Sequence, residues 1–146
     1  MNAPHLVGDW IRGITIRQPW ATCILAGKTV ENRTVHWPWR GWVLIHVGKA
    51  KPEPAVLRDP LVATAIRGRE LHLGAVIGVA RLVDCHLDQG PERCTNSWAQ
   101  RAAHHLVLAD VHELALPVPA RGALSAWKPT RDLVGQVLQQ LPGLKP

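Results

Sequence analysis

A lysine, a carboxylate and an arginine lie close together at Lys28, Glu31 and Arg33. The pattern of residues 28–33 predicts a β-strand. In such a strand Thr29, Glu31 and Arg33 share one face, with Lys28 on the other, and Glu31 and Arg33 would stand about 7 Å apart. The carboxylate can accept from the exocyclic amine of cytosine or adenine, and the cations can hold a phosphate or a base carbonyl. The alternative is a structural salt bridge between Glu31 and Arg33, and their spacing leaves both interpretations open.

The charge imbalance of the chain is concentrated around these residues. Residues 12–51 contain seven cations and one carboxylate, which gives this stretch the same net charge of +6 as the whole chain. The stretch also contains four of the seven tryptophans, namely Trp20, Trp37, Trp39 and Trp42. Positive charge interleaved with flat aromatic rings suits an anionic ligand with stackable bases, and nucleic acid is the commonest such ligand. We therefore expect RNA or DNA as the partner.

Length and composition are those of an ordinary globular protein. With 146 residues, 47% of them hydrophobic and 19% charged, the chain is expected to form one domain over residues 1–146, with its core over about 12–141. No apolar run approaches the roughly 20 residues of a membrane span, so no membrane partner is expected. The N-terminus lacks the basic and apolar regions of a secretory signal. Three cysteines, an odd and small number, favour a reducing cytoplasm over a disulfide framework.

The hydrophobic pattern predicts five or six short strands with helices inserted between them. The expected strands are residues 12–16, 28–33, 42–47, 74–87 (with a bend or bulge at Gly78), 105–109 and 112–118. The expected helices are residues 20–26, 52–67 and 130–141, the last with Thr130 as its N-cap. Residues 90–100 are expected to form a loop or a short helix. This order favours an α+β fold built on a small β-barrel over a parallel sheet.

Four segments early in the chain form a joint pattern: residues 16–21 (IRQPWA), 26–33 (AGKTVENR), 40–41 (RG) and 45–49 (IHVGK). Together they resemble the ASCH family, the activating-signal-cointegrator homology domain of the PUA-like superfamily, whose signature is Gly-x-Lys-x-x-Glu-x-Arg. Lys28, Glu31 and Arg33 match this signature, whereas its glycine position holds Ala26, with Gly27 one residue later. Later segments are similar to the cointegrator-type subgroup, namely Gly78, residues 83–85 and residues 126–128.

The resemblance implies a PUA-like β-barrel of five to six mostly antiparallel strands with inserted helices. It also implies a cleft lined by the signature strand and the helix before it, and members of the family are mostly inferred to bind RNA or DNA. We expect a single strand or a single nucleotide to bind in this basic, tryptophan-lined cleft. The candidate nucleic-acid-binding residues are Arg17, Gln18, Trp20, Lys28, Glu31, Arg33, Trp37, Trp39, Arg40, His46, Lys49, Trp127 and Lys128.

The tryptophans carry different expectations. Trp37 and Trp39 flank a proline in a loop, where a buried role is harder to arrange, so both are expected to line the cleft. Trp42 is expected in the core, and Trp20 suits either place. Trp98 shows no sign of a role in a site.

A second hypothesis is a hydrolase that uses the same cleft. Hydrolases of the ASCH family have a Lys–Thr–Glu arrangement with threonine three residues after the signature lysine, but here that position holds Glu31. The chain could still hydrolyse a modified nucleoside with Lys28 and Glu31 as an acid–base pair, or RNA with His46 and Lys49. For His46, on an apolar strand, a satisfied core histidine is the alternative. We rank binding above hydrolysis because the threonine nucleophile is missing.

No metal ion or other cofactor is expected. The chain has no Cys-x-x-Cys pair, and its cysteine and histidine spacings fit no usual zinc finger. Buried cysteines and solvated loop histidines are therefore the expected roles of Cys85, His86, Cys94, His104 and His105.

Overall fold

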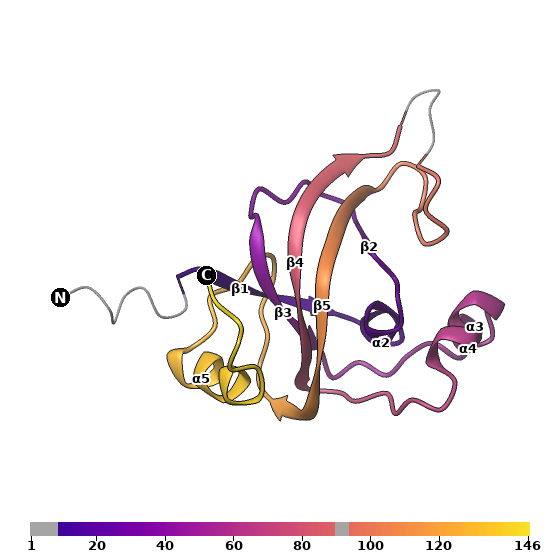
Figure 1. The fold of residues 1–146 in the computed structure, drawn as a ribbon. Coiled ribbons are helices and arrows are strands. Elements are labelled where there is room, and N and C mark those ends of the chain that lie inside the picture. Colours follow the sequence, from indigo (N-terminus) through magenta and orange to yellow (C-terminus); the bar gives the residue numbers. More distant parts are fainter. Residues whose placement is uncertain (1–8, 90–93) are drawn as a thin grey trace.

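The computed structural model describes residues 9–89 and 94–146, and within them it contains five strands and four short helices (Figure 1). The strands are β1 (Ile11–Ile16), β2 (Val30–Arg33), β3 (Gly41–Val47), β4 (Ala75–Leu87) and β5 (His104–Pro119). The helices are α2 (Trp20–Leu25), α3 (Pro54–Leu57), α4 (Pro60–Ile66) and α5 (Arg131–Gln140). The α+β class expected from the sequence is confirmed. Residues 94–100 form a loop, and residues 90–93 of the predicted 90–100 segment lie outside the described residues.

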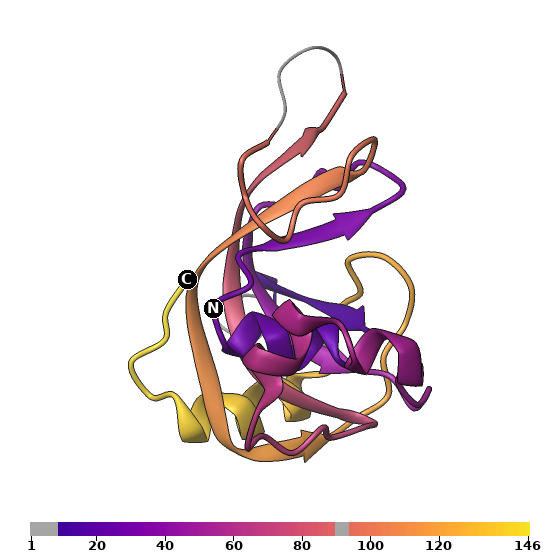
Figure 2. The same ribbon diagram turned by 90° about the vertical axis from the view of Figure 1, so that its right-hand side faces the viewer.

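The strands form one mixed sheet in the order β1-β3-β4-β5-β2. β1 runs parallel to β3, and the other three pairings are antiparallel. The sheet curves into a half-barrel with β1 and β2 at its two edges (Figures 1 and 2). The Arg33 guanidinium of β2 donates to the Thr15 carbonyl of β1 over 2.9 Å, so a side chain joins the two edge strands. This mostly antiparallel sheet agrees with the small barrel-like fold that we expected.

Helices cover both faces of the sheet, with α5 on one side and α2, α3 and α4 on the other (Figure 1). Successive side chains of a strand point to opposite faces, so a strand covered on both faces is a continuous apolar run. β3 is such a strand: Val43 and Ile45 pack with the buried residues of α2, whereas Trp42 and Leu44 pack with those of α5. The core therefore consists of two apolar layers with β3 between them.

Residues 104–119 form one strand where the sequence predicted two. Where the sequence predicted a break, the strand bends without ending. Asp110 has a φ of 51°, and the β4–β5 register is irregular at this point. Asp tolerates this left-handed backbone better than most residues, and its carboxylate lies 3.4 Å from Arg81 on β4. The bulge predicted at Gly78 is confirmed by a register shift, and a Cβ there would lie 2.7 Å from the His112 carbonyl oxygen.

Residues 52–67, predicted as one helix, form two. Proline lacks an N–H group, and Pro60 begins α4 after Asp59, whose carboxylate accepts from two backbone N–H groups of the first turn at 3.0 and 3.3 Å. The predicted C-terminal helix and its cap are confirmed, since Thr130 Oγ1 accepts from the Leu133 amide over 3.1 Å. Within residues 9–89 and 94–146, no helix has the length and apolar character that a membrane crossing requires.

Candidate functional site

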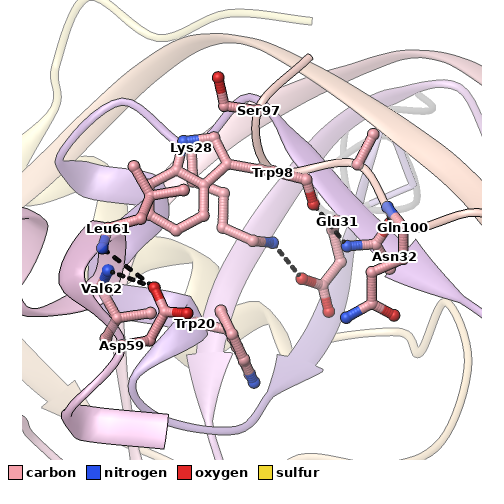
Figure 3. Close-up of a pocket in the computed structure, with 11 residues that line it drawn as sticks. Trp20, Lys28, Glu31, Asn32, Asp59, Leu61, Val62, Ser97, Trp98 and Gln100 are labelled. Atoms are coloured by element: carbon pink, nitrogen blue, oxygen red, sulfur yellow. Dashed lines mark hydrogen bonds and ion pairs between the residues drawn. The ribbon is translucent and has the colours of Figure 1, made fainter. Parts of the chain in front are cut away.

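A cavity of about 380 Å³ lies between α2, β2, the start of α4 and residues 94–103, which we call the Trp98 loop (Figure 3). Its wall contains two indole rings, those of Trp20 and Trp98, and its lining charges are Lys28, Glu31 and Asp59. The cavity is therefore aromatic and polar, with one cation against two carboxylates. The remaining lining residues, none of which was a sequence candidate, are Asn32, Leu61, Val62, Ser97, Ala99 and Gln100.

Lys28 and Glu31 form a buried ion pair in this cavity. Lys28 Nζ lies 2.7 Å from Glu31 Oε1, and the two side chains are 2% and 9% exposed. Figure 3 shows the lysine side chain extending toward the carboxylate. Arg33 approaches the other carboxylate oxygen, Oε2, at 3.2 Å. The Glu31–Arg33 salt bridge that the spacing left open is thus present, and Glu31 has two cationic partners.

The position of Lys28 differs from the predicted strand geometry. β2 begins at Val30, and Lys28 lies in the turn that follows α2. Gly27, with a φ of 116°, makes this turn, and the Lys28 amide donates to the Cys23 carbonyl over 2.9 Å. The alternation of faces does not apply outside the strand, so Lys28 reaches the same side as Glu31. The prediction that the two side chains face opposite ways is therefore wrong.

Trp98, to which the sequence assigned no role, is held in the cavity wall by hydrogen bonds from distant residues. Asn32 of β2 donates to the Trp98 carbonyl and accepts from the Gln100 amide, each over 2.9 Å. Asn96 accepts from the Trp98 amide and donates to the Thr29 hydroxyl, again over 2.9 Å. The contacts with β2 and with Thr29 span 66 to 68 residues of sequence, which no local pattern reveals. The one available signal is an aromatic ring in the polar run of residues 95–100.

The predicted tryptophans of residues 37–40 do not line this cavity. Trp37 lies in a loop as expected, but it is 4% exposed and belongs to the core, so the prediction that its ring lines a cleft is wrong. Trp39 packs against the same core layer, with the Arg12 guanidinium 4.4 Å from its ring centroid. Arg40 donates to the carbonyls of both tryptophans. Because the chain has neither Phe nor Tyr, tryptophan fills large core positions, including the expected one at Trp42.

Arg17 and Gln18 support the local structure before α2. Gln18 is buried, and its amide group accepts from the Thr22 amide over 3.1 Å and donates to the His72 carbonyl over 3.0 Å. Arg17 donates to the Lys51 carbonyl over 2.9 Å. Of the Gln-Pro-Trp motif, only the tryptophan lines the cavity.

His46 and Lys49 lie at a second cavity, of about 510 Å³. His46 Nε2 lies 2.7 Å from the Ala120 carbonyl, which can only accept, so Nε2 carries the proton. Nδ1 then accepts from the Thr15 hydroxyl over 3.1 Å. Burial lowers the pKa of His46 below 6.5, although the Ala120 carbonyl acts in the opposite direction. His46 is thus neutral, buried and hydrogen-bonded on both nitrogens, as in the core-histidine interpretation.

The last two candidates also lie away from the first cavity. Trp127 Nε1 donates to the Thr15 hydroxyl oxygen over 3.2 Å, and the Trp127 backbone pairs with Gly13 of β1. Lys128 Nζ lies 3.6 Å from an Asp9 carboxylate oxygen. The structure thus brings together Trp20, Lys28, Glu31 and Arg33 at one place, and Thr15, His46, Lys49 and Trp127 at another.

The residues of the first cavity suit recognition of a flat polar ring. Lys28 has three N–H donors, one of which is used by Glu31, and a carboxylate has about four lone-pair sites for acceptance. The indoles offer faces on which a ring can stack. Comparison with known proteins finds no protein-family model and no curated protein that matches the chain. The resemblance to the ASCH family therefore rests on the sequence motifs alone.

Proposed function

We propose that this chain is a PUA-like domain of the ASCH type that binds single-stranded RNA or DNA by taking one base into the cavity lined by Trp20 and Trp98. The observation that carries the proposal is the buried Lys28–Glu31 pair inside a cavity with two indole rings. Two features support the family assignment: the three signature side chains form one ion-pair network, and a helix, α2, precedes the signature strand.

The size of the cavity favours one nucleotide over a longer segment. A volume of about 380 Å³ is near the lower end of the roughly 300–1,000 Å³ typical of small-ligand pockets. Stacking of a base on an aromatic side chain contributes about 1–3 kcal/mol and depends little on which base it is. The tryptophans thus supply affinity, and the polar groups supply discrimination.

The lining charges favour a base over a phosphate inside the cavity. The carboxylates of Glu31 and Asp59 balance the Lys28 ammonium and the Arg33 guanidinium, which lies 3.2 Å from Glu31 Oε2, so a phosphate would meet no net positive charge. The amino group of cytosine or adenine is a donor that Glu31 can accept from, and the neighbouring ring acceptor can take a hydrogen bond from Lys28. We infer that a base with an exocyclic amine enters and that the phosphates remain outside.

Fluorescence anisotropy with labelled single-stranded oligonucleotides tests this function. Oligonucleotides of cytosine or adenine are expected to bind more tightly than those of uracil, which lacks the amine. Trp98→Leu should weaken binding about 5- to 150-fold, the equivalent of one lost stacking contact. Trp10→Leu is the matched control, because Trp10 packs against the other apolar layer and does not line the cavity. Equal affinities of Trp98→Leu and the parent protein would refute the proposal.

The hydrolase alternative is tested with the same protein. Incubation with acetylated cytidine is expected to give no product, because no threonine stands at position 31 and the Thr29 hydroxyl is held by Asn96. Turnover that disappears in Lys28→Met, with the fold intact by circular dichroism, would make the chain a hydrolase instead. RNA cleavage that survives Lys28→Met and is lost in Lys49→Ala would place a ribonuclease at the second cavity.

A further inference from the structure

Three side chains from separate parts of the chain meet beside the Trp98 loop. His86 on β4 pairs in register with His105 on β5, and Cys94 lies in the segment that joins these strands. Their donor atoms all lie within 4.8 Å of one another. The spacings along the chain gave no reason to expect a metal site, because the strand register, which is not visible in the sequence, creates this cluster.

The hydrogen bonds of His105 fix which of its nitrogens carries the proton. His105 Nε2 lies 2.7 Å from the Gln100 carbonyl, which can only accept, so the proton of a neutral ring is on Nε2 and Nδ1 has a lone pair. His86 Nδ1 lies 3.5 Å from an Asp84 carboxylate oxygen, a contact too long to fix the tautomer of this half-exposed ring. His86 Nε2 and His105 Nδ1 face each other at 3.1 Å, so in the absence of a metal the His86 Nε2–H donates to the His105 lone pair.

When the His86 proton is on Nδ1, beside Asp84, its Nε2 turns a second lone pair toward that of His105 Nδ1, and a cation between the two nitrogens replaces the hydrogen bond. A zinc ion bound at about 2.0–2.1 Å from each nitrogen satisfies both. Ligating histidines usually donate their other N–H to a carboxylate or a backbone carbonyl, and Asp84 and Gln100 fill these places here. Asp88, with its side chain 5% exposed, accepts from the Cys94 amide over 3.4 Å and contacts Arg101 at 2.9 Å, so the loop that carries the thiol is anchored.

We propose that His86, Cys94 and His105 bind a zinc ion. Two imidazoles and one thiolate suit zinc, a borderline-soft ion that accepts both nitrogen and sulfur ligands. Three protein ligands leave the fourth tetrahedral position for water or an external ligand. The His86 side chain is 43% exposed, which gives an ion access from solvent, whereas His105 is fully buried and positions the site within the fold.

Titration of the chelator-treated full chain with Co²⁺ and then Zn²⁺ tests this site. One equivalent of Co²⁺ is expected to give a thiolate-to-cobalt charge-transfer band, which one equivalent of Zn²⁺ removes. Zn²⁺ should also raise the Tm, because it binds the folded state. Cys94→Ser should abolish the band, and Asp84→Asn should weaken Zn²⁺ binding about 10-fold while the band is retained. Circular dichroism verifies that each variant is folded.

Cys85→Ser is the matched control, because Cys85 lies with His36 and His104 in a neighbouring trio of the same donor types. Its charge-transfer band is expected to match that of the parent. The proposal is overturned if the band survives Cys94→Ser or if it is lost in Cys85→Ser. It is also overturned if Zn²⁺ binds only in large excess without a change in Tm, since this would mean adventitious binding to surface histidines.

Discussion

Removing the charge of Glu31 is expected to destabilise the fold more than removing the charge of Lys28. After Glu31→Gln, the Lys28 ammonium remains buried without a carboxylate. Breaking a buried pair by removing one partner costs about 3–5 kcal/mol, because the remaining charge is left without compensation. After Lys28→Met, Glu31 keeps Arg33 at 3.2 Å, so we expect a loss of about 1–3 kcal/mol. Domain stabilities are about 5–15 kcal/mol, so a chain whose stability lies above the lower end of this range stays folded after either change.

The double variant Lys28→Met/Glu31→Gln gives the sharper result. It leaves no buried ammonium, so it is expected to lose less stability than Glu31→Gln alone. Urea denaturation measures the free energy of unfolding, and an unchanged m-value verifies that the same surface becomes exposed. Glu113→Gln is the control, because the pair of Glu113 with Arg69 has the similar distance of 3.1 Å but side chains that are 55% and 33% exposed. Its loss should stay below about 1 kcal/mol.

Two results would refute this reasoning. If Glu31→Gln costs no more than Glu113→Gln, the burial of Lys28 does not make its charge costly. If the double variant loses the sum of the two single losses, the two side chains do not interact. Because this pair supports the fold, a change at Lys28 or Glu31 would mix a loss of stability with any loss of binding. Trp98→Leu is therefore the variant that tests binding.

Three further changes test separate parts of the structure. Gly13→Ala should cost about 1–3 kcal/mol in urea denaturation, because a Cβ would overlap the Trp127 indole. Gly135→Ala, in open space on α5, should instead stabilise by about 0.5–1 kcal/mol. Because burial lowers the pKa of His46 below 6.5, the unfolded chain binds its proton first, and stability should fall as the pH drops through 6.5. His46→Gln, compared with the parent at about pH 5 and pH 7, should reduce this dependence; an unchanged pH profile would contradict the assignment.

The helices and strands that could be predicted from the sequence are those determined by residues within the same segment. β3 is an apolar run long enough for a strand, and α5 has its own cap in Thr130. The fused strand β5 was missed because the bend at Asp110 depends on its pairing with β4, which a single segment does not reveal. Residues 52–67 were predicted as one helix, although Asp59 and Pro60 are a local signal for the start of a new helix. The signal for a helix start was thus present in the sequence, but the length and composition of residues 52–67 were taken to indicate one continuous helix.

The candidate site was predictable only where its residues are close in sequence. Lys28, Glu31 and Arg33 fall within one turn and one strand, so their spacing alone indicated a cluster. Trp98 joins them through hydrogen bonds from distant residues, and its own segment carries no periodic pattern. Trp37 shows the opposite error: the neighbouring proline correctly predicted a loop, but its ring was expected to line a cleft and is instead buried. In a chain without Phe or Tyr, tryptophan is the only aromatic residue available for the core.

The two proposed sites share the Trp98 loop, which predicts that their ligands influence each other. Cys94 begins this loop, while the Gln100 carbonyl accepts from His105 and the Gln100 amide donates to Asn32 in the cavity. Zinc bound to Cys94 and His105 would fix the loop. Stacking of a base on Trp98 would then cost less conformational entropy, because less of the chain remains to be ordered. Such coupling is reciprocal: the factor by which zinc raises oligonucleotide affinity must equal the factor by which the oligonucleotide raises zinc affinity. We expect about 5-fold or more, measured by anisotropy with and without Zn²⁺ and by zinc titration with and without oligonucleotide. Identical affinities under both conditions would mean that the two sites are independent and that the loop is already fixed by Asn32 and Asn96.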